Sequence, residues 1–332
     1  GGSKNRMEIK QTREGLLRLG GAVSAAAIAG GLGTFDAGVA NAQAAPADLP
    51  RGRTLRMVFG GGGGKFTDAG VGNPYAAGAT HQIGNAALWE PLFYYSAFAD
   101  DMLPWLATGY SYSEDFTSLT VNIRKGAEWG DGHAFTADDV AFTFNLLRGN
   151  TKLSYGTAMK QFVANVEALD ANTVKFTFNS PNPRFLFEYL AFKFDNGVKL
   201  LPKHIFEDKD PIEFLWFDTE KGWPCGTGPY KITLWTETQK FMDLRQDWWG
   251  AKSMFATLPM VERIIFTPYS DDNRTAQLLA SNEVDASLDL RPGTIKALLP
   301  QNKALITHSF NRPPFGYVDW WPNSFWVNTA LE

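Results

Sequence analysis

Strict alternation of apolar and polar residues marks two segments of the chain, 118–124 (SLTVNIR) and 172–179 (NTVKFTFN). Successive side chains of a strand point to opposite faces of a sheet, so a period of two predicts two half-buried strands. The residues expected on their buried faces are Leu119, Val121, Ile123, Val174, Phe176 and Phe178. The segment 54–59 (TLRMVF) is predicted to form a further buried strand.

Between the two alternating segments, residues 137–148 have the spacing of a helix. Thr136 is a favourable N-cap, and Asp139 three residues later makes a variant of the capping box. Phe135 and Val140 stand where a hydrophobic staple requires apolar residues. The expected buried stripe of this helix consists of Val140, Phe144 and Leu147.

The segment 125–147 (KGAEWGDGHAFTADDVAFTFNLL) gathers four carboxylates, a histidine and a tryptophan. Asp131 belongs to an Asp-Gly turn, and Asp138 and its neighbour lie in the first helical turn, where the helix dipole favours anions. Glu128 is the one carboxylate without an evident structural role. The residue order of a calcium-binding loop is absent, and His133 is interpreted as a turn residue. We therefore predict a strand-to-helix connection, with no catalytic residue and no metal ligand.

A run of five glycines, 60–64, follows the first predicted strand and leads to Lys65. A phosphate-binding loop would need glycine at Phe59 and serine or threonine at Phe66, so that motif fails at both ends. Two interpretations remain: a flexible loop at the end of a strand, which we favour, or a bare backbone that a ligand can approach closely.

Farther along, the segment 261–290 predicts a compact strand-helix-strand unit whose helix is capped by Asp272. Its expected buried residues are Leu278, Leu279, Val284, Ala286, Leu288 and Leu290. The segment 81–96 has helical spacing that stops at Pro91, and the turn 226–230 (GTGPY) leads into another strand.

Residues 7–44 have the features of a signal peptide. Basic residues precede a run of small apolar residues that is shorter than the about 18 residues of a membrane span, and an Ala-x-Ala site follows at 42–44. Cleavage there would make Ala45 the first residue of an exported, periplasmic protein. A glutamate stands where a twin-arginine signal has its second arginine, so the Sec and twin-arginine routes both stay open. The residues before Met7 are left out of the fold prediction.

Composition narrows the classes of function. The chain has 332 residues, 44% of them hydrophobic, and a formal net charge of −4, which argues against a nucleic-acid partner. Its single cysteine, Cys225, excludes an internal disulfide and is interpreted as a small buried residue. Aromatic residues make up 14% of the chain and suit either a core or flat ligand surfaces.

Taken in order, these segments resemble the extracellular solute-binding proteins of family 5, the peptide-, dipeptide- and oligopeptide-binding proteins of ABC importers. The resemblance runs from about residue 54 to the end. It rests on the segments LTVNIRKGAEWGDGHAFTADDVAFTFNLL, PNPRFLFEYL, LLPKHIF, PCGTGPYKI, DLRQDWWGAK and LLASNEVDASL. It implies a mixed α/β, periplasmic binding protein-like fold of the type II, bilobed architecture, without a cofactor.

The resemblance also implies a domain organisation. Segments 45–88 and 181–310 would form a discontinuous first lobe, and residues 89–180 a subdomain inserted into it. Residues 311–332 would begin the crossing to a second lobe that is largely missing from this chain. The protein is then expected to be a monomer that delivers its ligand to a membrane permease.

The ligand stays open between an oligopeptide and an oligosaccharide. The candidate ligand contacts are Phe66, Trp320 and Trp321, whose rings are expected to face solvent in the cleft. Two other classes remain as alternatives: a secreted carbohydrate-active enzyme, suggested by the aromatic residues and carboxylates, and a non-catalytic adhesion or scaffold module.

Overall fold

The structure is a computed structural model, and it describes residues 46–316 except 62, 77, 80–83, 98, 194–196 and 288–289. The predicted signal peptide lies outside these residues. Within the described part of the chain, no helix is long and apolar enough to cross a membrane.

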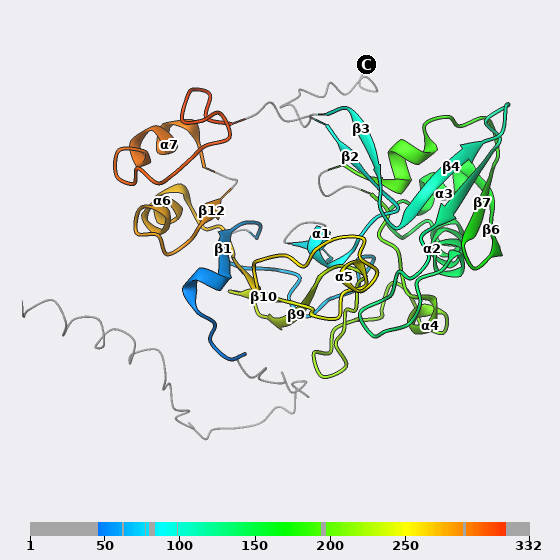
Figure 1. The fold of residues 1–332 in the computed structure, drawn as a ribbon, viewed down its shortest axis with the longest axis horizontal. Helices are drawn as coiled ribbons and strands as arrows, with labels where there is room; N and C mark the ends of the chain where they lie inside the picture. Colours follow the sequence, from blue (N-terminus) through cyan, green and yellow to red (C-terminus); the bar gives the residue numbers. More distant parts are fainter. Residues whose placement is uncertain are drawn as a thin grey trace, which may run out of the picture. The chain divides into compact units, whose positions relative to one another are not determined.

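The described chain mixes strands with helices, as the sequence predicts (Figure 1). The strands are β1 Thr54–Val58, β2 Phe93–Ser96, β3 Asp101–Pro104, β4 Ala107–Tyr112, β5 Ser118–Ile123, β6 Val163–Asp170, β7 Thr173–Phe178, β8 Ala191–Phe192, β9 Tyr230–Trp235, β10 Lys240–Leu244, β11 Arg263–Thr267 and β12 Ala286–Ser287. The α-helices are α1 Asn85–Leu88, α2 Ala137–Gly149, α3 Gly156–Phe162, α4 Lys203–Phe206, α5 Trp249–Lys252, α6 Asp272–Ala280 and α7 Pro292–Leu298. A 3-10 turn, η1, covers Arg51–Arg53, and a π-helical turn, η2, covers Leu186–Leu190.

One five-stranded sheet has the order β12-β1-β11-β10-β9. β1 pairs in parallel with both β11 and β12, whereas β10 is antiparallel to each of its neighbours. Helix α6 connects β11 to β12, so this part of the sheet is a crossover unit. The strand predicted at 54–59 and the strand-helix-strand unit predicted at 261–290 are both present here.

A second sheet, β4-β5-β7-β6, is antiparallel throughout, and helix α2 packs on β6 and β7 (Figure 1). The two alternating segments form its central strands β5 and β7, and their predicted buried faces are confirmed. A third, three-stranded sheet has the order β3-β2-β8. All strands of the second sheet come from residues 107–178, inside the range predicted as a subdomain, whose boundaries stay a prediction.

The start of helix α2 follows the predicted capping pattern. Asp139 Oδ2 accepts a hydrogen bond from the backbone N–H of Thr136 at 2.9 Å, as a capping box requires. Phe135 and Val140, the predicted staple, are both buried. The helix ends at Gly149, one residue beyond the prediction.

Two local predictions differ from the structure. In the segment 81–96 the helix covers only Asn85–Leu88 and so ends before Pro91, the predicted end. The residues from Phe93 onward, beyond the predicted helix, form β2 and pair with β3 and β8. Residues 81–83 lie outside the described part. The N-cap of α6 is Asp271, whose side chain accepts from Arg274 N at 2.9 Å, and not Asp272.

The glycines of the GTGPY turn are required because this turn lies very close to the backbone of helix α1. The N–H of Gly228 donates to Leu88 O at 2.9 Å, which joins the turn to helix α1. A Cβ on Gly226 would lie 1.8 Å from Leu88 O, and a Cβ on Gly228 would lie 2.3 Å from Ala87 O. Only glycine allows this contact, which sets the start of β9.

Candidate functional site

Three parallel strands end together at one edge of the five-stranded sheet. The register pairs Val58 of β1 with Thr267 of β11 and with Ser287 of β12. Ligands of open α/β sheets bind outside the carboxyl ends of their parallel strands. This carboxyl edge, made of the segments that follow β1, β11 and β12, is therefore the candidate functional site.

The glycine run lies at this edge and is tied to the segment after β11. Tyr269 N donates to Gly60 O at 2.9 Å, and Gly64 N donates to Tyr269 O at 3.1 Å. A Cβ on Gly61, which has a φ of +70°, would lie 2.6 Å from Lys65 O. The close backbone packing accounts for glycine at position 61, and the lack of side chains leaves the peptide groups of the described glycines accessible.

Asp272 joins the two helices that leave this edge. Its Oδ1 accepts from the Tyr269 hydroxyl at 2.6 Å, and its Oδ2 accepts from the Thr294 hydroxyl at 2.8 Å. Its Oδ2 also accepts from Arg291 N at 3.2 Å. These hydrogen bonds lower the pKa of Asp272, and the bond from Tyr269 has the largest effect. Asp272 is thus an ionised residue that positions α6 and α7, with its oxygens occupied by internal donors.

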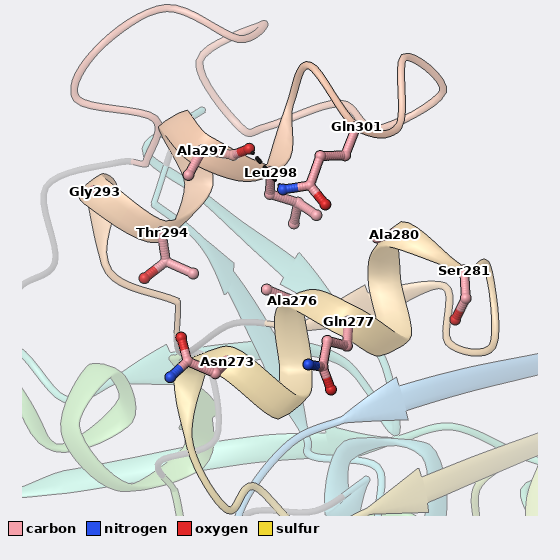
Figure 2. Close-up of a pocket in the computed structure, with 10 residues that line it drawn as sticks. All are labelled: Asn273, Ala276, Gln277, Ala280, Ser281, Gly293, Thr294, Ala297, Leu298 and Gln301. Carbon is pink, nitrogen blue, oxygen red and sulfur yellow. Dashed lines mark hydrogen bonds between the residues drawn. The ribbon is translucent and has the colours of Figure 1, made fainter.

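A groove of about 950 Å³ runs between α6 and α7 (Figure 2). Small residues, uncharged polar side chains and one leucine line it; they are Asn273, Ala276, Gln277, Ala280, Ser281, Gly293, Thr294, Ala297, Leu298 and Gln301. The Gln301 amide is oriented by a hydrogen bond from its Nε2 to Ala297 O at 3.0 Å. Such a lining offers hydrogen bonds to neutral polar groups and supplies neither an acid nor a base.

Of the three predicted ligand contacts, Phe66 alone lies within the described part of the chain. Phe66 is only 1% exposed and belongs to the main core, with its N–H bonded to Glu237 O at 2.7 Å. The expectation that its ring faces solvent is therefore wrong, because the chain turns inward directly after the glycine run. Trp320 and Trp321 lie outside the described residues. A role in ligand contact stays a prediction for all three.

The predicted turn at Asp131 meets two residues that are distant in sequence. Asp131 Oδ2 lies 2.8 Å from His204 Nε2 and accepts from Cys225 Sγ at 3.5 Å. Burial, followed by the charge of Asp131, raises the pKa of the Cys225 thiol, so it stays protonated and is a poor nucleophile. The predicted burial of Cys225 is confirmed.

His133 stands beside this pair, and sequence reasoning considered it alone. The structure gathers one ligand atom each from Asp131, His133 and His204 within 4.8 Å of one another, the geometry of a candidate metal site. His204 was missed because it is 73 positions from Asp131, although its segment LLPKHIF contributes to the family resemblance.

A buried carboxylate lies elsewhere in the core. Glu90 is 3% exposed, and its two oxygens accept hydrogen bonds from Trp105 Nε1 at 2.9 Å and Trp249 Nε1 at 2.8 Å. Burial raises the pKa of Glu90 to about 7, against the lowering effect of these bonds. Because Glu90 is buried and both of its oxygens accept hydrogen bonds from indole N–H groups, it has a structural role and cannot contact a substrate.

Comparison with known proteins decides the family. The model for the bacterial extracellular solute-binding proteins, family 5, matches residues 101–324, more than half of the chain. The chain belongs to this family. Family 5 consists of binding proteins, so the chain is grouped with proteins that carry a solute rather than transform it.

Curated relatives of this family 5 chain have peptide-related names. An ABC transporter peptide-binding protein of Brucella ovis is 29% identical over 238 residues, which are 70% of this chain and 41% of that protein. The dipeptide-binding protein of Escherichia coli is 24% identical over 249 residues, 70% of this chain and 44% of its own. The family 5 chain thus spans less than half the length of these relatives.

A solved structure confirms the fold expected for family 5. The periplasmic oligopeptide-binding protein of Thermotoga maritima, crystallised with mannohexaose, is similar with a TM-score of 0.67 and 27% identity. The match covers 81% of this chain and 47% of that one. The chain therefore has the mixed α/β architecture of type II binding proteins over the part that it spans.

Proposed function

We propose that this chain is the solute-binding component of an ABC importer and that it captures an oligopeptide or an oligosaccharide for transport. The observation that carries the proposal is the carboxyl edge of β1, β11 and β12 in a member of family 5. Peptides are favoured by the names of the relatives, and sugars by the mannohexaose bound to the Thermotoga protein.

The proposed binding mode follows from the groups at the edge. The exposed backbone of Gly61 and of Gly63 offers donors and acceptors. The groove between α6 and α7 adds amides and hydroxyls without a formal charge. Backbone amides of a peptide and hydroxyls of a sugar both match such groups, whereas a strongly charged solute would find no counter-charge among the groove's lining residues.

We further propose that the protein acts in the periplasm as a monomer and passes its solute to a membrane permease. The leader-like residues 7–44 and the extracellular character of family 5 support export. A domain division at 89–180 is supported by the antiparallel sheet built from residues 107–178.

Isothermal titration of the chain with a panel of short peptides and a panel of oligosaccharides tests the proposal. We expect saturable binding of one class, and chromatography should recover that solute chemically unchanged. Shortened peptide or sugar products formed in proportion to protein would support the alternative of a secreted enzyme. Absence of binding to both panels would contradict the proposal.

A further inference from the structure

The geometry points to a second site, independent of the carboxyl edge: a surface site for one divalent transition-metal ion, held by Asp131, His133 and His204. His133 Nδ1 lies 3.2 Å from Asp131 Oδ1, and His204 Nε2 lies 2.8 Å from Asp131 Oδ2. One atom from each of the three side chains fits within a 4.8 Å span. Two imidazoles and a carboxylate thus lie close together.

The spacing of these atoms suits a small ion. Ligand atoms bind Zn²⁺ at about 2.0–2.2 Å, so two ligands of one tetrahedral ion lie roughly 3.3 Å apart. The separations of 3.2 Å for His133 and 2.8 Å for His204 from the oxygens of Asp131 are close to that value. The imidazole rings of His133 and His204 lie 4.0 Å apart and nearly parallel, at 21°, so the rings must rotate to direct one nitrogen each at a shared ion.

The backbone holds all three ligands in place. Trp129 N donates to His133 O at 2.8 Å, which closes the turn that carries Asp131 and His133. Next to His204, the backbone N–H of Lys203 donates to Asp139 Oδ1 at 2.9 Å. The residues after His204 are buried and anchor helix α4. An ion would therefore meet ligands whose backbone positions are already fixed.

The site is open to an ion from solution. The side chains of His133, His204 and Asp131 are 62%, 30% and 22% exposed. The remaining coordination positions would be taken by water. Behind the carboxylate, the Cys225 thiol donates to Asp131 Oδ2 at 3.5 Å and can keep one oxygen oriented as an outer partner.

The ligand set selects the class of ion. Imidazole nitrogens suit Zn²⁺, Ni²⁺ and Cu²⁺, whereas Mg²⁺ and Ca²⁺ take oxygen ligands, of which Asp131 is the single side-chain source here. Bound metal would cross-link the turn before α2 to helix α4. This inference does not rest on the proposed solute, because it uses none of the residues of the carboxyl edge.

Titration of the untagged chain with ZnCl₂, by calorimetry and by competition with a chromophoric chelator, tests the site. We expect one Zn²⁺ per chain, and no saturable binding of Mg²⁺ at the same concentrations. His133→Asn and His204→Asn should each weaken Zn²⁺ binding by about tenfold or more, since even loss of an outer partner costs about 10- to 100-fold. His308→Asn, at an exposed histidine in a different part of the chain, is the matched control and should bind as the parent does.

Copper spectroscopy provides a readout that does not depend on affinity. Cu²⁺ on the parent chain should show an electron paramagnetic resonance spectrum with coupling to two imidazole nitrogens, and His133→Asn should reduce it to one. His133 is exposed, so this variant should keep the parent's circular dichroism spectrum. Absence of Zn²⁺ binding, or equal affinity in the parent and both histidine variants, would overturn the proposal.

Discussion

The carboxylate of Asp139 accepts a hydrogen bond from the backbone N–H of Lys203 at 2.9 Å. The same side chain caps helix α2 through Thr136 N, at 2.9 Å, so one nearly buried carboxylate fixes the start of α2 and the start of α4. A residue that the sequence explains as a helix cap is therefore also a long-range link, and through Lys203 it positions the neighbouring His204.

Asp139→Ala should lower the free energy of unfolding by about 3 kcal/mol, because it leaves two backbone donors without their acceptor and each unpaired group costs about 1–3 kcal/mol. Thr136→Ala should cost about 1 kcal/mol, the usual loss of an N-cap side chain. Urea unfolding followed by circular dichroism measures both. Equal losses in the two variants would show that the bond to Lys203 contributes nothing.

Glu90 should make stability depend on pH. Burial raises its folded pKa from the usual 4.5 to about 7, so the folded protein holds the proton more tightly than the unfolded chain. This contribution is fully present below pH 4.5 and is lost as the pH rises through about 7, by roughly 3 kcal/mol in all. Glu90→Gln cannot titrate, so the difference in unfolding free energy between parent and variant should change in that window. A difference that is constant from pH 4 to pH 8, about the range of the window, would contradict the prediction.

Gly226→Ala should destabilise the protein by about 3 kcal/mol or more, since overpacking already costs about 1–3 kcal/mol and here the obstacle is the backbone oxygen of Leu88. Gly149→Ala is the matched control, because a Cβ there meets nothing within 4 Å. It should be neutral or slightly stabilising in the last turn of α2. Similar unfolding midpoints for both variants would rule out the close approach.

Expression of the whole chain in a bacterium tests the proposed leader. We expect protein in the periplasmic fraction whose first residue is Ala45, because an Ala-x-Ala site ends the apolar run. Edman sequencing of that fraction gives the answer. Protein that keeps residues 7–44, or that stays wholly in the cytoplasm, would contradict export by this segment.

The elements that the sequence predicts well are those fixed by near neighbours. The strands β5 and β7 and the helix α2 depend on alternation, on helical spacing and on a cap within a few residues, and the structure contains all three. The sequence places the N-cap of α6 one residue too late, because Asp271 and Asp272 can both cap a helix. In the structure Asp272 instead joins Tyr269 to Thr294 through hydrogen bonds.

Contacts between distant segments could not be predicted in this way. The pairing of His204 with Asp131 and the two indoles around Glu90 join residues many positions apart, and no local period marks them. The sequence predicts that Phe66 faces solvent in the cleft, but burial is set by what packs over a residue, and Phe66 lies in the main core. The carboxyl edge likewise became visible only when the parallel register of β1, β11 and β12 was known.

Hydrogen exchange measured by mass spectrometry, with and without ligand, tests whether a solute binds at the carboxyl edge. With the better peptide or oligosaccharide at about 1 mM, where even weak binding is populated, we expect slower exchange in the peptides that contain Gly61, Tyr269 and Thr294. Peptides from β5 and β7 should not change. Protection confined to other segments, or none with either class of solute, would contradict a solute site at the carboxyl edge.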